Sequence, residues 1–319
     1  MGLLAGPMLI RYGYQKEISM GLVAAGGSLG ILIPPSIMLV MMADQGGLSA
    51  GKLLMAGVVP GVTLGALYMI YIGIRCFVNP KIGPPVPAEE LALIPMSARI
   101  KDTVRYALPP LALIFLVLGA IFFGLATPTE AAGVGAFAAF VMVIAYGKLT
   151  WRNFADCLYQ TSRTVTMVII IIVGATCFTG VFLGLGGGTA LVNAILGLGL
   201  GKWGTYVLIM IIYVILGCFI DWIGIVMITF PIFLPVAQQL GFDMLWFVSM
   251  LAINLQMSFL TPPFGYALFY LSGLGIEGVK LSHIYRGVLP FLTLQAIGVA
   301  ICTMFPEVVV WLPHVMLGK

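Results

Sequence analysis

Long apolar stretches separated by short polar segments dominate the pattern of this chain. Runs such as 106–126 and 165–187 each offer about 20 apolar residues, enough for a helix to cross ~30 Å of hydrocarbon. Several other stretches are shorter or are interrupted by Gly or Pro. The pattern predicts an all-α, multi-pass integral membrane protein in which some helices are broken. The apolar stretches are 18–43, 53–78, 106–126, 131–147, 165–187, 204–220, 223–240, 244–259, 262–273 and 288–312.

Two polar linkers, 79–105 and 148–163, stand out between the apolar stretches. Together with Arg75 they hold eight of the 15 Lys and Arg residues. Because positive charge gathers in cytoplasmic loops, we expect both linkers on the cytoplasmic side. The stretches 106–126 and 131–147 supply the two crossings required between them.

Composition agrees with this pattern and excludes other classes. The chain of 319 residues is 61% hydrophobic and 8% charged, whereas a soluble domain is about 25% charged. The net charge of +4 is scattered at the ends of apolar runs, so no nucleic-acid partner is expected. An intramembrane enzyme is disfavoured, because no nucleophile constellation or transition-metal ligand set can be nominated.

An internal repeat organises the chain. Five points of the first part recur 228 residues later, and a sixth recurs after 230 residues. Acidic and basic residues exchange places between the two copies, which predicts an inverted repeat. The matching points are Pro7 with Pro235, Gly13 with Gly241, Tyr14 with Phe242, Pro34-Pro35 with Pro262-Pro263, Lys52 with Lys280, and Val59-Pro60 with Leu289-Pro290.

The repeat also bears on length. The second copy begins near Lys148, so the first copy would begin about 80 residues before Met1. This arithmetic predicts a chain that lacks its N-terminal segment.

The segment 24–36, AAGGSLGILIPPS, cannot form an uninterrupted helix, because Pro35 removes a hydrogen bond and clashes with the preceding turn. Its repeat partner, 254–263, has the same double proline. Carbonyl groups freed at membrane depth are tolerated where they line a cavity or bind a cation. Oxygen ligands without an adjacent carboxylate favour a monovalent cation such as Na⁺. The candidate cation-binding residues are Gly26, Gly27, Ser28, Gly30, Pro34, Ser258, Thr261 and Pro262.

Asp221 stands alone inside an apolar run and has two compatible interpretations. A carboxylate at membrane depth favours a functional role, and it could equally cap the following helix at the tip of a re-entrant hairpin. Thr229 continues the same hairpin. Helix starts at Ser36 and near Asp221 would favour an anionic solute. The candidate substrate-facing residues are Pro35, Ser36, Asp221, Thr229, Asn254 and Pro263.

The segment 127–132, TPTEAA, is typical of a helix start. Thr127 would be the N-cap, Pro128 the first helical residue and Glu130 the capping-box partner. A proton-carrying role for Glu130 is the alternative.

Taken together, these segments resemble the large membrane subunit of tripartite ATP-independent periplasmic (TRAP) transporters. The resemblance covers essentially the whole chain. It rests on 24–36, on Gly51-Lys52-Leu53 with Val59-Pro60-Gly61, on 127–132, on Asp221 with Pro231 and Pro235, and on 260–265, LTPPFG.

The resemblance implies an inverted-repeat, elevator-type permease like those of the ion transporter superfamily, with re-entrant hairpins and broken helices. It implies Na⁺ as the coupling ion, no other cofactor, and a bacterial inner-membrane location. The implied partners are a small four-helix membrane subunit and a periplasmic solute-binding protein. That protein would deliver an organic anion such as a C4-dicarboxylate, a sugar acid or a keto acid. A non-transporting membrane fragment or scaffold is the alternative.

The resemblance also implies a division of the chain. Residues 1–52 would hold the end of a first hairpin and the first broken helix, and 165–275 the second hairpin and second broken helix, together forming the transport domain. The scaffold would comprise a helix and cytoplasmic linker at 53–105, further helices at 106–164, and a C-terminal helix at 276–319.

Overall fold

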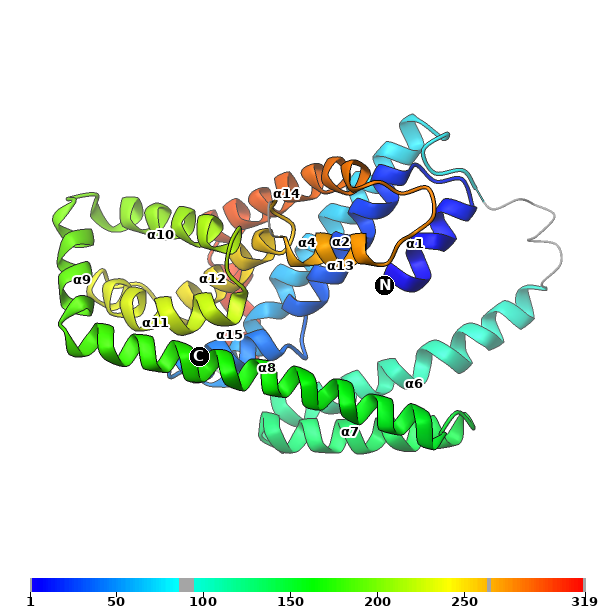
Figure 1. Ribbon diagram of the computed structural model, residues 1–319, viewed down its shortest axis with the longest axis horizontal. Coiled ribbons are helices and arrows are strands. Elements are labelled where there is room, and N and C mark those ends of the chain that lie inside the picture. The colour runs from blue at the N-terminus through cyan, green and yellow to red at the C-terminus, as the bar shows by residue number, and fades with distance from the viewer. Residues whose placement is uncertain (1, 86–94, 263–264, 318–319) are drawn as a thin grey trace. The chain divides into compact units, whose positions relative to one another are not determined.

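The structure is a computed structural model that describes residues 2–85, 95–262 and 265–317. Every regular element in these ranges is an α-helix, which confirms the all-α prediction. The helices are α1 (Gly2–Arg11), α2 (Lys16–Leu32), α3 (Ile37–Gln45), α4 (Ala50–Val78), α6 (Met96–Phe122), α7 (Pro128–Ala145), α8 (Trp151–Gly184), α9 (Gly187–Gly197), α10 (Gly201–Gly217), α11 (Trp222–Gln239), α12 (Met244–Ser258), α13 (Tyr266–Gly273), α14 (Leu281–Met304) and α15 (Glu307–Leu317) (Figure 1).

Six of the described helices are long and apolar enough to cross a membrane: α4, α6, α7, α8, α11 and α14. A seventh candidate is the pair α2 and α3, which are bent by 43° at a short break. The structure therefore supports the prediction of a multi-pass membrane protein.

The chain divides into two compact units, residues 1–84 with 171–319, and residues 85–170. In the second unit α6 packs against α7, Tyr106 stacks on Tyr146, and the Tyr146 hydroxyl donates to the Arg105 carbonyl at 2.8 Å. The predicted start of α7 is confirmed in full, because Thr127 and Glu130 form a reciprocal capping box with Pro128 in the first turn. The Glu130 carboxylate therefore serves as the capping-box partner of Thr127.

The order of helices in the first unit follows the predicted repeat. Shifting α2 by 228 residues places its first residue on Met244, where α12 begins, and shifting α3 places it on α13. The same shift places most of α4 on α14. Gly13 and Gly241, which match in the repeat, both adopt positive φ, 79° and 68°, in the turns that end α1 and α11.

The structure adds detail to three segments of the sequence pattern. The polar segment 148–163 is mostly helical, because α8 begins at Trp151, and 79–105 becomes helical at Met96. Charged side chains on an exposed helix face are compatible with helix formation, so a polar segment between apolar stretches can be partly helical. The apolar stretch 288–312 is divided at Phe305 and Pro306 into α14 and α15, because proline cannot continue a helix at this position.

Candidate functional site

The first break lies between α2 and α3, at residues 33–36, as the double proline predicts. Pro34 is buried and Pro35 is exposed, and the peptide bond between them is cis. Ser36 is buried and caps α3: its hydroxyl accepts from the Leu39 N–H at 3.2 Å and donates to the Ile31 carbonyl. A single hydroxyl therefore ends one helix and starts the next.

The second break separates α12 from α13. The Thr261 hydroxyl donates to the Met257 carbonyl at 2.6 Å, and the Gly265 N–H donates to the Thr261 carbonyl at 3.0 Å. Thr261 and Pro262 are partly buried. Pro263 lies outside the described residues.

At both breaks a proline leaves a carbonyl without its usual donor. The residue four positions after Gly30 is Pro34, and the residue four positions after Ser258 is Pro262, so neither carbonyl can receive the normal helical N–H. No described residue donates a backbone hydrogen bond to either one in its place. Gly30 and Ser258 are equivalent in the repeat, so the structure has two matched carbonyl groups available to a ligand.

The predicted hairpin is formed by α10 and α11, which pack against each other. Asp221 lies at its turn and caps α11, accepting from the Ile223 N–H at 3.3 Å. The capping interpretation of Asp221 is therefore confirmed. The carboxylate is also exposed at a pocket, so the functional interpretation remains compatible with the geometry.

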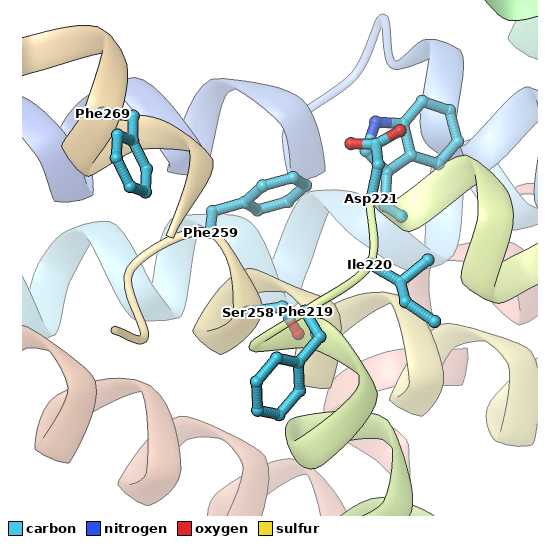
Figure 2. Close-up of a pocket in the computed structure, with 8 residues that line it drawn as sticks. Phe219, Ile220, Asp221, Ser258, Phe259 and Phe269 are labelled. Atoms are coloured by element: carbon cyan, nitrogen blue, oxygen red, sulfur yellow. The ribbon is translucent and has the colours of Figure 1, made fainter. Parts of the chain in front are cut away.

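That pocket, which we call the tip pocket, has a volume of about 370 Å³ and is lined by Gly217, Phe219, Ile220, Asp221, Trp222, Ser258, Phe259 and Phe269. Figure 2 shows Ile220 and Asp221 on the extended turn after α10, and Ser258 and Phe259 at the end of α12. The hairpin turn and the second break therefore form one site. The Ser258 hydroxyl is buried and has no hydrogen-bond partner, which is costly unless a ligand or water satisfies it.

A second pocket of about 220 Å³, the break pocket, contacts both broken helices. It is lined by Gly2, Val23, Ala24, Gly27, Ser28, Ile31, Phe259, Ala267, Tyr270 and Leu271. Ile31 and Phe259 are equivalent in the repeat, so the two breaks converge on this cavity. Phe259 lines both pockets and lies between them.

The predicted glycines of the first break lie inside the last turns of α2 rather than in the break itself. A Cβ added at Gly26, Gly27 or Gly30 would meet nothing within 4 Å, so this glycine face is open. Ser28 is buried and its hydroxyl donates to the Ala25 carbonyl at 3.0 Å, which leaves its oxygen lone pairs free to accept or ligate.

Two predicted substrate-facing residues lie away from these pockets. The Thr229 hydroxyl is buried against α10, where it pairs with Tyr213 and donates to the Ile225 carbonyl at 2.7 Å. Asn254 is buried and donates to the Met210 carbonyl at 2.9 Å, joining α12 to α10. The structure thus brings together Asp221 and Ser258 at the tip pocket, while Ser28 lines the break pocket. Ser36 and Thr261 lie at the breaks themselves.

Two residues of this site, Gly217 and Phe259, were not predicted from the sequence. Gly217 ends α10 so close to α12 that an added Cβ would overlap the Ser258 side chain. Phe259 separates the two pockets. Each is close in sequence to a feature that was predicted, Gly217 to the turn at Asp221 and Phe259 to Ser258. An isolated Gly or Phe in an apolar run does not, however, indicate which residue it contacts.

Comparison with known proteins places the chain in a family. Residues 1–308 match the family described as the tripartite ATP-independent periplasmic transporter, DctM component. The chain is 34% identical over 315 residues to the large permease protein DctM of a C4-dicarboxylate TRAP transporter from Pseudomonas aeruginosa, covering 98% of this chain and 71% of that protein.

Two further relatives carry different substrate names. The permease protein DctMQ of an isethionate TRAP transporter from Oleidesulfovibrio alaskensis is 30% identical, over 97% of this chain and 47% of that protein. The large permease protein SiaM of a sialic acid TRAP transporter from Vibrio cholerae is 30% identical, over 96% of this chain and 69% of that protein. The fold, the paired breaks and these matches lead to one conclusion: the chain belongs to the DctM family and is a membrane-embedded transporter subunit of a TRAP system.

Proposed function

We propose that this chain is the permease subunit of a Na⁺-coupled secondary transporter that imports an organic anion across the bacterial inner membrane. The anion would be delivered by a periplasmic solute-binding protein, and the chain would work with a small four-helix membrane subunit. The observation that carries the proposal is that residues next to both repeat-related breaks, Ile31 and Phe259, line one cavity. At each break a neighbouring carbonyl, of Gly30 or Ser258, has lost its helical donor.

The donor atoms at the breaks suit Na⁺. The carbonyls of Gly30 and Ser258 and the hydroxyls of Ser28, Ser258 and Thr261 are hard, neutral oxygen ligands. The buried Ser258 hydroxyl has no hydrogen-bond partner among the described residues, which supports ligand binding at the second break. In this proposal Gly26 and Gly27 keep the face beside Ser28 open, while Pro34 and Pro262 free the carbonyls.

The anion would lie at the starts of the helices that resume after the breaks. Helix N-termini favour negative charge, and the N-cap of α3, Ser36, directly follows the exposed Pro35. At the start of α11 the Asp221 carboxylate already occupies that position, so we assign Asp221 to shaping the tip pocket. The relatives named for C4-dicarboxylate, isethionate and sialic acid transport all have organic-anion names, which supports this substrate class.

Binding of Na⁺ to oxygens from both breaks would couple the ion to the substrate. The oxygens of both breaks must be in position at the same time for the cation to bind. The bound cation would therefore hold the two broken helices in the arrangement that binds the anion. An elevator movement of α1–α3 and α9–α13 against the remaining helices is our proposal for translocation. This grouping follows the division into transport domain and scaffold expected from the sequence.

Reconstitution tests the proposal directly. Proteoliposomes holding this permease, its small membrane subunit and the anion-loaded binding protein should accumulate labelled anion only with an inward Na⁺ gradient. The Ser258→Ala variant removes the unpartnered hydroxyl and should raise the Na⁺ concentration for half-maximal uptake by about tenfold, the effect of ~1.4 kcal/mol of lost binding. The matched control Ser272→Ala, on the exposed surface of α13, should behave as the unaltered protein. Uptake that is independent of Na⁺ would overturn the proposal that Na⁺ is the coupling ion. The absence of any uptake by the complete assembly would overturn the proposal that the chain is a transporter subunit.

A further inference from the structure

A third cavity lies between α10 and α14 of the first unit. It is a groove of about 430 Å³ lined by Tyr206, Val207, Met210, Ile211, Val214, Ile215, Asn254, Ala296, Val299, Ala300, Thr303 and Met304. Both α10 and α14 pack against α12, which forms the floor of the groove between them. Tyr206 and Thr303 close one end through a 2.8 Å hydrogen bond between their hydroxyls. We refer to this cavity as the α10–α14 groove.

The lining of the groove is apolar along its length. From Tyr206 to Ile215 it follows α10 for about 14 Å, at 1.5 Å per residue. Its few polar groups are already paired: Asn254 bonds to the Met210 carbonyl, and Tyr206 bonds to Thr303. A ligand of this groove therefore gains burial of apolar surface and few hydrogen bonds, which describes a hydrocarbon chain.

The groove has the capacity for one hydrocarbon chain. At roughly 30 Å³ for a water-sized group, a volume of about 430 Å³ holds on the order of fourteen such groups, comparable to one acyl chain. This capacity and the apolar lining fit one lipid tail.

The end of the groove has the features of a headgroup site. Lys202 and Trp203 lie one turn before Tyr206 and Val207 on α10, so they continue the same face. Both are exposed, and no carboxylate lies within 4 Å of the Lys202 ammonium in the described part of the chain. The ammonium donates to the Gly241 carbonyl at 2.8 Å and lies 4.5 Å from the centre of the Phe242 ring, so two of its three protons remain for a phosphate oxygen.

Aromatic side chains gather at this end of the groove, and among them Trp203 is exposed. Trp203, Tyr206, Phe242 and Trp246 form a connected cluster with ring centres 5.3–6.1 Å apart. Trp and Tyr concentrate at the level of the lipid headgroups. A cation without a carboxylate partner, an aromatic cluster and an apolar groove therefore follow one another in the order phosphate, glycerol and acyl chain.

The geometry points to the α10–α14 groove as a binding site for an anionic phospholipid, with the phosphate at Lys202 and Trp203 and one acyl chain along α10 and α14. The lipid would fill the space between α10, which belongs to the hairpin, and α14.

Lipid binding to the purified permease tests this inference without any transport measurement. Native mass spectrometry with phosphatidylglycerol and phosphatidylcholine should show one phosphatidylglycerol retained per chain in preference to phosphatidylcholine. Lys202→Gln should weaken the retention of phosphatidylglycerol at least fivefold and leave phosphatidylcholine unchanged. Ala300→Trp, which fills the groove from α14, should abolish retention of both lipids at this site.

Matched controls separate the site from general lipid affinity. Lys101→Gln removes an exposed lysine of α6, and Ile297→Trp places the same large ring on an exposed position of α14 that does not line the groove. Both controls should bind lipid as the unaltered protein does, and all four variants should elute as monodisperse particles. A phosphatidylglycerol with a photoreactive acyl chain should label 206–215 or 296–304.

Three outcomes would overturn the inference. One is retention by Lys202→Gln and Ala300→Trp equal to that of the unaltered protein, and another is photolabelling confined to other helices. The third is that the thiol of an Ala300→Cys variant becomes protected from a thiol reagent only when the small membrane subunit or a second copy of the chain is present. In that case the groove is a protein interface.

Discussion

The two broken helices, α2 and α12, occupy equivalent places in the repeat but are held by the protein in different ways. In α12, 12 of 15 residues are buried, and its Asn254 is bonded to α10. In α2, 10 of 17 residues are buried, and the face at Gly26, Gly27 and Gly30 is open. The repeat therefore supplies two similar breaks, of which one is embedded in the core and the other keeps one side free.

The contacts on the closed side of α2 explain how it can leave the other side open. Gly21 of α2 and Gly287 of α14 meet backbone to backbone, since a Cβ at either would overlap a main-chain carbonyl of the other helix. The repeat partner of Gly21 is Ser249, whose side chain is buried and donates to the Leu245 carbonyl of its own helix at 2.7 Å. We infer that α2 is fixed along one line by close glycine packing, whereas α12 is fixed by contacts all round.

The largest expected effect comes from closing that glycine contact. Gly21→Ala would place a methyl group on the Gly287 carbonyl and 2.9 Å from the Phe291 ring. A main-chain carbonyl cannot rotate out of the way as a side chain can, so α2 and α14 must move apart. We expect this to lower the free energy of unfolding by about 3 kcal/mol. Denaturant unfolding of the purified protein in detergent measures the loss.

Two controls sharpen this test. Gly73→Ala on α4 has open space around its Cβ and should leave the stability unchanged or slightly higher. Ser249→Ala, the repeat equivalent on α12, should cost less than Gly21→Ala. Equal losses at Gly21 and Ser249 would contradict the difference between the two helices.

The next effect concerns Ser258 and its repeat equivalent, Gly30. Gly217→Ala would overlap the Ser258 hydroxyl and Cβ, and because a side chain can shift, the expected cost is about 2 kcal/mol. Gly30→Ala meets open space and should not lower the melting temperature. The double variant Gly217→Ala with Ser258→Gly should recover much of the lost stability, and a failure to recover would show that the clash is not with Ser258.

Much of this fold follows from the sequence because its signals are local. The double prolines located both breaks, and the 228-residue offset matched α2 with α12 and α3 with α13. Thr127, Pro128 and Glu130 form the predicted cap because a capping box is encoded within four residues. Such features need no knowledge of distant neighbours.

The contacts of the site could not be derived in the same way. Gly217 and Ser258 meet across 41 positions of sequence, and Gly21 and Gly287 across 266, and an isolated Gly gives no indication of its partner. Thr229 was expected at the substrate, but its hydroxyl is buried against Tyr213. Apolar helices of a membrane protein carry polar groups both for packing and for function, and only the three-dimensional contacts separate the two.

A smaller effect compares the caps that restart a helix after each turn. Asp221→Ala removes the acceptor for the Ile223 N–H and should cost about 1 kcal/mol, as should Ser36→Ala at the start of α3. Asp221→Asn keeps the acceptor and should retain both the stability and at least about half of the uptake, since Asn and Asp cap equally well. Loss of uptake in Asp221→Asn without a change in melting temperature would show that its charge takes part in transport.

The smallest effect is expected from the one ion pair of the described structure, which lies at the start of α2. Glu17 Oε1 and His283 Nε2 are 4.0 Å apart, and both side chains are partly exposed. Such a pair contributes at most about 0.5 kcal/mol, and only while the imidazole is protonated. The repeat equivalents are Leu245 and Met55, so α12 and α4 have no counterpart to this pair.

A double-mutant cycle with Glu17→Gln and His283→Gln should therefore give a coupling energy far below the loss caused by Gly21→Ala. A coupling of several kcal/mol would mean that charge rather than glycine packing holds α2 against α14, and the contrast between the two broken helices would then rest on electrostatics.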